Sequence, residues 1–224
     1  MILTTDEITW VIDKLNTYGI KYQEIYDELK DHLLTAIENL REAGDDRSVE
    51  MLFDEVVKQQ FPGYWPFEDI LKQYQVAYRH KIGKAMWANM QYYCNWQTAP
   101  LIVLLLVIGF YLPHTKPVMG SLLVSLLLMA VIPLVYTYRN GRRISTGKGR
   151  QSLIKGYVFN QANLLMIIIN LLLNGIGALS RQWDAAAFLN PMHYHPVVYM
   201  LLFSFFIIYG LSCIRLCRQE FKIA

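Results

Sequence analysis

Hydrophobic and polar positions follow a helical period up to about residue 90, and beyond about residue 98 long apolar runs follow one another. The first pattern is typical of amphipathic helices. Each later run approaches the length of about 20 apolar residues that a helix needs to cross a bilayer. We therefore expect an all-α chain with a small cytoplasmic helical domain over 1–90 and a four-helix transmembrane bundle over 91–224. The expected spans are about 92–112, 118–138, 157–179 and 197–214.

Four helices are predicted in the first part. Thr4-Thr-Asp-Glu7 is a capping box, in which a Thr side chain and a Glu three residues later satisfy the free amide groups at a helix start. Gly19 ends that helix, and Gly44 ends a second helix that begins near Tyr22. Ser48 begins a third, and a fourth starts near Pro66. Gly83 and the stretch 89–97 are the places where the fourth helix could bend.

Charge divides the chain at the same place. Residues 1–90 hold sixteen Asp and Glu against ten Lys and Arg, a net charge of −6, whereas residues 91–224 hold two against eleven, a net charge of +9; the two sum to the +3 of the chain. Acids are costly in hydrocarbon, and loops on the cytoplasmic side of a membrane are rich in Lys and Arg. The distribution indicates a cytoplasmic domain joined to a membrane region.

The loop between the second and third spans carries six cations and no acid. By the positive-inside rule this loop and both termini lie in the cytoplasm of a bacterial inner-membrane protein. The cations also suit contact with anionic lipids. The six are Arg139, Arg142, Arg143, Lys148, Arg150 and Lys155. Polar residues from Thr4 onward predict no cleavable signal peptide, and the three cysteines are expected to stay reduced.

One stretch resembles a known family. It comprises Tyr26-Asp-Glu-Leu-Lys-Asp-His-Leu-Leu-Thr-Ala-Ile-Glu-Asn-Leu40, then Glu42-Ala-Gly44, then Ser48 with Leu52-Phe53, Val57 and Phe61. This region is similar to the HAAS alpha-helical signalling domain of bacterial membrane proteins. The resemblance implies a role in bacterial signalling and a cytoplasmic partner, often a transcription regulator.

An acidic face is predicted on the second helix. Its members are Glu24, Asp27, Glu28, Asp31 and His32. The spacing of Glu28 and His32 can chelate a metal, but no second pair completes a site. We expect instead a surface that binds a basic partner or the chain's own 139–156 loop.

A polar stripe is predicted on the third span. Asn160, Asn163, Asn170 and Asn174 fall within a sector of roughly 80° on a helix. Unpaired amides in hydrocarbon cost several kcal/mol, so the stripe faces other helices or water. Two interpretations remain open: hydrogen bonding between helices, often at the seam of a homo-oligomer, or a polar path for a ligand or ion. The first is favoured.

Few features of the sequence indicate catalysis or metal binding. His114, His193 and His195 are predicted on the outer side and could bind a metal or sense pH, although loop histidines usually do neither, so no metal or cofactor is expected. The sequence lacks the signatures of a zinc protease, a serine hydrolase and a redox dithiol. We expect no enzyme and no direct nucleic-acid binding.

The pattern as a whole predicts a membrane-bound signalling or regulatory protein. In this hypothesis the bundle responds to a condition of the membrane, and the cytoplasmic helices hold or release a protein partner. The alternative is a small oligomeric channel or permease component, with the asparagine stripe lining a path.

Overall fold

The computed structural model describes residues 3–61, 67–147, 149–171 and 194–221. Within these ranges the regular structure is helical, apart from one isolated parallel bridge between Tyr22 and Gln151. The contacts divide the chain into two units. A helical unit comprises 1–81 and 145–154, and an apolar unit comprises 82–144 and 155–224. The prediction of an all-α chain is confirmed for the described residues.

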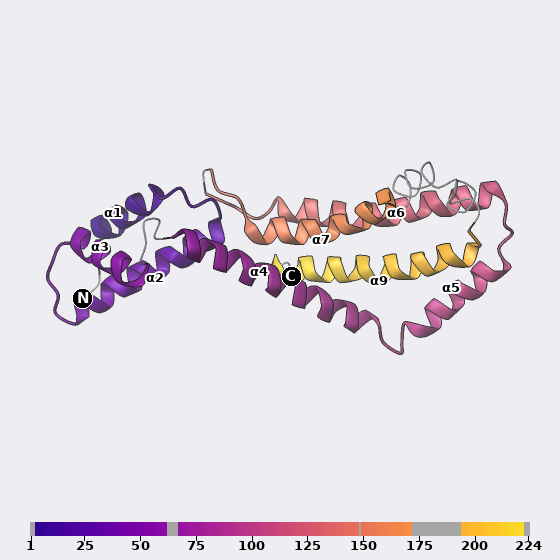
Figure 1. Cartoon of the computed structure of the whole chain (residues 1–224), viewed down its shortest axis with the longest axis horizontal. Helices are drawn as coiled ribbons and strands as arrows, with labels where there is room; N and C mark the ends of the chain where they lie inside the picture. The colour runs from indigo at the N-terminus through magenta and orange to yellow at the C-terminus, as the bar shows by residue number, and fades with distance from the viewer. Residues whose placement is uncertain (1–2, 62–66, 148, 172–193, 222–224) are drawn as a thin grey trace, which may run out of the picture. The chain divides into compact units, whose positions relative to one another are not determined.

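The helical unit is built from α1 (Thr5–Asn16), α2 (Gln23–Glu42), α3 (Val49–Gln60) and the start of α4 (Glu68–Tyr93) (Figure 1). The predicted capping box is present at α1. The Thr4 backbone N–H donates to the Glu7 carboxylate at 2.9 Å, and the Glu7 N–H donates to the Thr4 hydroxyl at 3.4 Å. Gly19 and Gly44 adopt positive φ angles of 62° and 91°, which explains why glycine stands where α1 and α2 end.

A compact core joins α1, α2 and α3. Each helix turns its periodic apolar positions inward, and full burial of one such side chain contributes about 1.5–3 kcal/mol. Trp10 also packs edge-on against Phe53, with 5.7 Å between ring centroids. The most deeply buried members are Val11, Leu15, Ile25, Leu29, Leu33, Ile37, Leu52 and Phe53.

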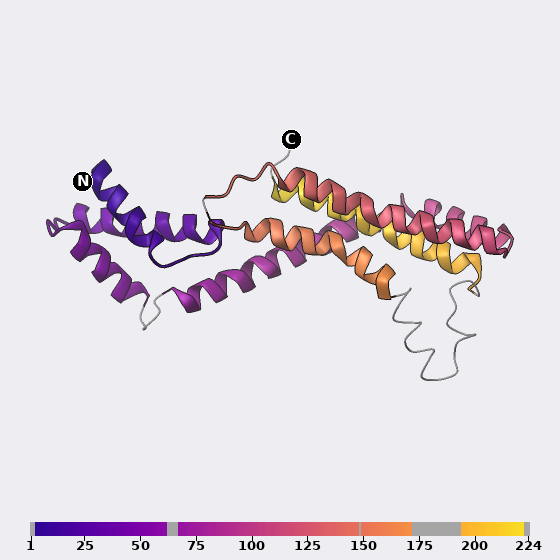
Figure 2. The same cartoon turned by 90° about the horizontal axis from the view of Figure 1, so that it is seen from above.

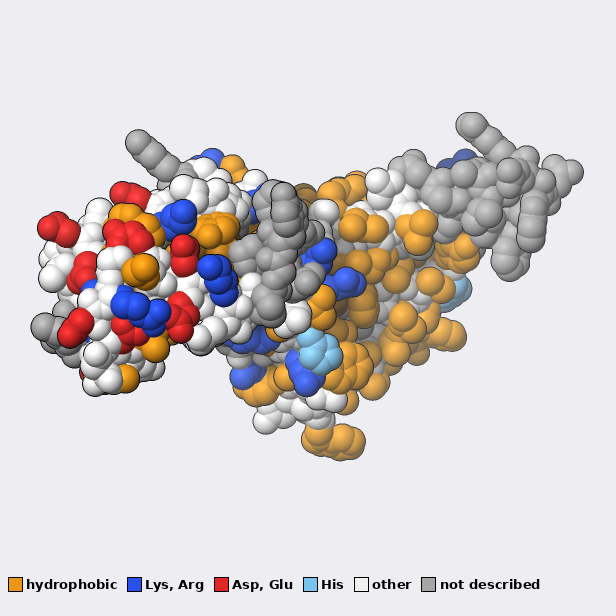
Figure 3. Space-filling model, turned by 60° about the vertical axis from the view of Figure 1, so that its left-hand side comes forward, with side chains coloured by type: hydrophobic (Ala, Val, Ile, Leu, Met, Phe, Trp, Pro, Cys, Tyr) orange, Lys and Arg blue, Asp and Glu red, His pale blue; other side chains and the backbone are white. Residues whose placement is uncertain are grey.

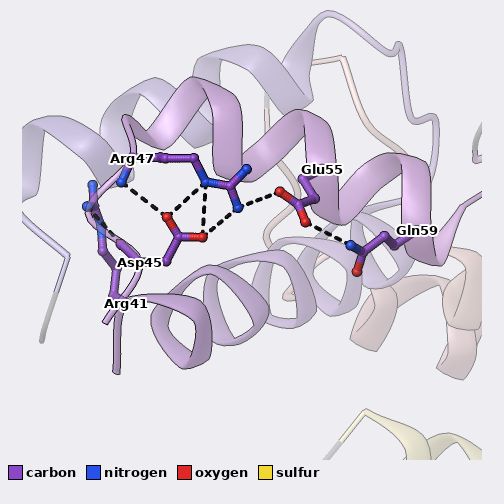
Figure 4. A network of polar contacts seen from close by, with 5 residues as sticks. All are labelled: Arg41, Asp45, Arg47, Glu55 and Gln59. Carbon is purple, nitrogen blue, oxygen red and sulfur yellow. Dashed lines mark hydrogen bonds and ion pairs between the residues drawn. The ribbon is translucent and has the colours of Figure 1, made fainter. Parts of the chain in front are cut away.

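A network of polar side chains fixes the turn between α2 and α3 (Figure 4). The Arg47 guanidinium donates to the Asp45 carboxylate and also pairs with Glu55. Glu55 accepts a further hydrogen bond of 2.9 Å from Gln59. These bonds from Arg47 lower the pKa of Asp45 to about 2.

The apolar unit contains α5 (Ala99–Tyr111), α6 (Lys116–Gly141), most of α7 (Leu153–Asn170), and α9 (Pro196–Glu220). In both ribbon views α9 runs beside α6, and it also contacts α5 (Figure 2). Gly109 permits the close approach of α5 to α9. A Cβ atom at this position would lie 2.8 Å from the Met200 Cγ and 3.0 Å from the Val197 Cα.

Two of the described helices are long and apolar enough to cross a membrane, judged by length and composition. They are α6, with 26 residues, and α9, with 25, and they contain the predicted spans 118–138 and 197–214. A four-span bundle is not confirmed. The third predicted span, 157–179, is described only to residue 171, as α7 and the residue after it.

The first predicted span, about 92–112, is not one helix. α4 continues through Gly83 without a break and ends at Tyr93, and α5 begins at Ala99. Asn95 explains the turn between them, because its side-chain oxygen accepts the backbone N–H groups of Gln97 and Thr98 at 2.9 and 3.2 Å. The 13 residues of α5 correspond to about 20 Å of helix, less than the roughly 30 Å of a hydrocarbon core.

Candidate functional site

The candidate site lies within the helical unit, where the segment 145–154 meets the start of α2. This segment follows α6 and leads into α7, yet it belongs to the unit of the N-terminal helices. The backbone N–H of Gln151 donates to the Lys21 carbonyl at 2.9 Å, and the Gln23 N–H donates to the Gln151 carbonyl at 3.0 Å. This short pairing accounts for the parallel bridge and holds the segment in one register.

Glu24 caps the first turn of α7. Its carboxylate accepts the backbone N–H groups of Leu153 and Ile154 at 2.8 and 3.3 Å, and it also accepts the Ser152 hydroxyl. The first N–H groups of a helix have no partners within the helix, and they form the positive end of its dipole. A carboxylate at this position satisfies both the hydrogen bonding and the charge. A side chain of α2 therefore determines how α7 begins.

Arg150 anchors the middle of the segment. Its guanidinium carbon lies 3.4 Å from the centre of the Tyr26 ring, and the same group donates to the Asn16 side chain. A cation over an aromatic face contributes about 0.5–2 kcal/mol. Gly149 has a φ of 78°, a conformation that favours glycine, and it turns the chain before Arg150. Gln23 completes the anchor by accepting the Gly147 N–H at 3.0 Å.

The structure gives the five residues of the predicted acidic face different surroundings. Glu24 binds the start of α7, and Glu28 lies near Tyr74 and Tyr78 of α4. Burial raises the pKa of both tyrosine hydroxyls, and the negative charge of Glu28 adds to the rise. Asp27 and Asp31 remain toward solvent, with side chains 49% and 75% exposed, beside Lys30. Figure 3 shows acidic side chains among basic ones on the surface of the helical unit.

A cavity of about 300 Å³ lies between α2 and α3. His32 is at its edge, where its ring also packs edge-on against Phe61 at 6.1 Å between centroids. The lining contains no Asp, Glu, Lys or Arg and is rich in side-chain amides. Its other members are Thr35, Ala36, Asn39, Leu40, Val56, Gln59 and Gln60.

The asparagine stripe lies on α7, on the side away from the residues that the chain buries. The buried positions are Val158, Ala162, Leu165 and Ile169. Asn160 and Asn170 are exposed and Asn163 is half-buried, whereas Asn174 lies outside the described residues. Gln161, which the sequence places off the stripe, accepts a hydrogen bond of 2.9 Å from the Tyr209 hydroxyl of α9.

The predicted histidine site is only partly described, because His193 lies outside the described residues. His195 is the N-cap of α9, and its Nδ1 accepts the Val197 N–H at 3.3 Å. His114 lies in the turn between α5 and α6. In the part of the chain that the structure describes, no three His, Cys, Asp or Glu side chains come together as a metal would require.

The cations of the 139–156 loop divide between the two units. Arg150 belongs to the site above, and Lys148 lies outside the described residues. Arg142 stacks over the Tyr138 ring at 4.7 Å and donates to its hydroxyl at 2.8 Å. The Lys155 side chain would contact a Cβ placed on Gly141, at 3.2 Å. Arg139 and Arg143, at the end of α6, are exposed.

Several residues that form the site were not predicted from the sequence. Ser152, Gln23 and Asn16 were given no role, although Ser before an apolar helical run is a typical N-cap signal. The arginine–tyrosine pairs within the apolar unit were not predicted either. Arg215 stacks over Tyr92 at 3.6 Å, and the Arg218 Nε donates to the Tyr136 hydroxyl at 3.1 Å.

Comparisons of the chain with models of protein families, with curated proteins and with solved structures find no match. The resemblance to the HAAS domain therefore stays a prediction from the residues quoted above.

Proposed function

We propose that the chain is a bacterial inner-membrane regulatory protein. In this proposal its helical unit binds a cytoplasmic protein partner and passes that event to α7 through the segment 145–154. The observation that carries the proposal is the cap formed by Glu24. The α7 helix starts on a side chain of the helical unit and continues in the apolar unit.

Membrane insertion is supported by the surface of α6. Four of its apolar side chains, each more than half exposed, recur at intervals of three or four residues and so share one face. Soluble proteins rarely expose apolar patches of this kind, whereas a lipid-facing helix requires them. The four are Val124, Leu128, Ile132 and Val135.

The partner surface that we propose comprises Asp27, Asp31 and the cavity between α2 and α3. The side chains of Asp27 and Asp31 are 49% and 75% exposed and share one cation, Lys30, so two carboxylates beside a single lysine keep a net negative charge that can steer a basic partner. The cavity adds apolar and amide groups within the same helices. A bacterial signalling role, with a transcription regulator among the candidate partners, is also what the resemblance to the HAAS domain implies.

In this proposal, partner binding is coupled to α7 because the partner and the segment 145–154 compete for the start of α2. Lys21, Gln23, Glu24 and Tyr26 hold the segment, and Asp27 and Asp31 lie on the next turns of the same helix. A partner that shifts or covers this end of α2 removes contacts from the segment. The first N–H groups of α7 then lose their acceptor. In this proposal the contact of Glu24 with the start of α7 links the binding of a cytoplasmic partner to a helix that continues in the apolar unit.

A pull-down tests this proposal. The full chain is purified from native membranes in mild detergent, and the bound proteins are identified by mass spectrometry. The double substitution D27N/D31N should lose a cytoplasmic protein that the parent retains. The control variant D13N, which changes an exposed carboxylate of α1, should retain this protein. If the parent and both variants bring down the same proteins, the partner surface proposed on α2 is wrong.

A second function is favoured by one observation. Asn160 and Asn163 lie away from the face that α7 buries within the chain, as residues lining a water-filled path would. An oligomeric channel or permease component would place these amides around such a path. Transport lost on replacing Asn163 with Leu while assembly persists would support this alternative.

A further inference from the structure

The α7 helix carries two distinct stripes. One packs within the apolar unit and comprises Val158, Ala162, Leu165 and Ile169. The other comprises Asn160, Asn163, Ile167 and Asn170, with successive spacings of three, four and three residues. This alternation is the spacing of the a and d positions in helices that pack side by side in a left-handed supercoil. The second stripe therefore has the periodicity of a helix–helix seam.

The composition of the second stripe suits neither lipid nor open water. If the carboxamides of Asn160 and Asn163 faced hydrocarbon, their donors and acceptors would be unpaired, at a cost of several kcal/mol each. Ile167, which lies among them, is 52% exposed, and a surface in water gains nothing from exposing it. A protein surface that offers both hydrogen bonds and an apolar contact satisfies the whole stripe.

We propose that this surface is α7 of a second copy of the chain, packed parallel and in register. The inference rests on the membrane insertion proposed above. All copies of a membrane protein insert with the same orientation, so the symmetry axis of a closed oligomer runs along the membrane normal. Identical residues then meet at the same depth. Asn160 faces Asn160 and Asn163 faces Asn163, and Ile167 packs against its own counterpart.

Asparagine fits such self-pairing because a carboxamide is donor and acceptor at once. A charged or purely accepting side chain would repel its own copy. Asparagine at a positions also fixes the register and the number of strands in parallel coiled coils. The apolar stripe of α7 is already buried within the chain, so the face with Asn160, Asn163 and Ile167 is the one that a second copy would meet.

Disulfide cross-linking in native membranes tests the seam. The parent carries C94S, because Cys94 is the exposed native thiol among the described residues. I167C places a thiol on the seam, and L164C is the matched control, three residues away and 38% exposed against 52%. Mild oxidation should yield at least about tenfold more dimer from I167C than from L164C. Equal yields from the two variants, or no dimer from I167C, would overturn the proposed seam.

The asparagines are tested in the same background. N160L and N163L should each weaken association about three- to fivefold, from hydrogen bonds worth about 0.6–1 kcal/mol between helices in a membrane. L164A lies off the stripe and should leave the cross-linking yield unchanged. If the cross-linking yield of I167C is unchanged by the double substitution N160L/N163L, these amides do not form the seam.

Labelling separates failure of the seam from failure of membrane insertion. A membrane-impermeant maleimide should not modify I167C in intact or opened vesicles. If it does, Ile167 is in water and the proposed membrane position of α7 is wrong. If I167C is protected and yet gives no dimer, the membrane proposal stands and the homomeric seam is wrong.

Discussion

The Glu24 carboxylate of α2 accepts the backbone N–H of Leu153 at 2.8 Å, although the two residues are 129 positions apart in the chain. Their contact decides where α7 begins, and it encloses α3, α4, α5 and α6 within one loop of chain. Closing so long a loop has an entropic cost that local contacts must offset. The surrounding bonds of Gln23, Arg150 and Ser152 provide that compensation.

Removing the charge of Glu24 should release the segment. E24Q keeps the size of the side chain but weakens the cap of α7, at a cost of about 1–2 kcal/mol, which corresponds to about a 5- to 30-fold shift in equilibrium. Trypsin should then cleave the detergent-solubilised chain after Arg150 about 5- to 30-fold faster. D31N, on an exposed carboxylate of the same helix, should leave the rate unchanged. Equal rates in E24Q and the parent would show that the cap does not hold the segment.

The aromatic ring of Tyr26 should contribute more than its hydroxyl to holding the segment 145–154. Y26L removes the aromatic face beneath Arg150 and should increase cleavage after Arg150 about two- to fivefold, as expected for a contact of about 0.5–1 kcal/mol. Y26F retains the ring and should behave as the parent does. A similar increase in both variants would assign the effect to the hydroxyl and contradict the stacking argument.

Acid should weaken the turn between α2 and α3. Arg47 holds the pKa of Asp45 at about 2, below its usual value of 3.8. A lowered pKa contributes stability above pH 4, and this contribution is lost as the pH falls through about 2. In thermal unfolding followed by circular dichroism, the melting temperature should fall further between pH 5 and pH 2 for the parent than for D45N. Identical pH profiles would remove Asp45 from the acid response.

Gly109 should resist substitution where Gly120 does not. G109A places a Cβ atom 2.8 Å from the Met200 side chain and 3.0 Å from the Val197 backbone. Overpacking of this kind costs about 1–3 kcal/mol. The melting temperature in detergent should fall for G109A. For G120A, whose Cβ meets nothing within 4 Å, it should stay constant or rise. An equal fall in melting temperature for both variants would contradict the assignment of the effect to the close contact between Gly109 and α9.

The helical unit was largely predictable because its signals are local. The capping box at Thr4, the glycines at 19 and 44 and the apolar period of α2 each act within a few residues. The break between α4 and α5 covers residues 94–98 and overlaps the stretch 89–97, where the sequence allowed the fourth helix to bend. The hydrogen bonds of the Asn95 side chain that form this turn could not be predicted from the pattern. The apolar run itself covers about residues 99–112, and the length that a membrane span requires extended the predicted span backward to residue 92.

The site was predictable only in part. Helical period places Glu24 and Asp31 near one another on α2, but it does not say which distant segment covers either of them. Contact with the chain's own loop was one of two expectations for the acidic face. In the structure Glu24 contacts that loop, whereas Asp31 stays in solvent. The difference arises from the tertiary position of residues 145–154, which no local pattern encodes.

The most direct test of the account is whether a change on α2 reaches α7. Hydrogen–deuterium exchange of the full chain in lipid nanodiscs would compare the parent, E24Q and D31N. The account predicts that E24Q speeds exchange both in the segment 145–152 and in the first turns of α7, over about 153–160, while D31N matches the parent. Faster exchange confined to 145–152, with α7 unchanged, would contradict the claim that the helical unit controls this helix.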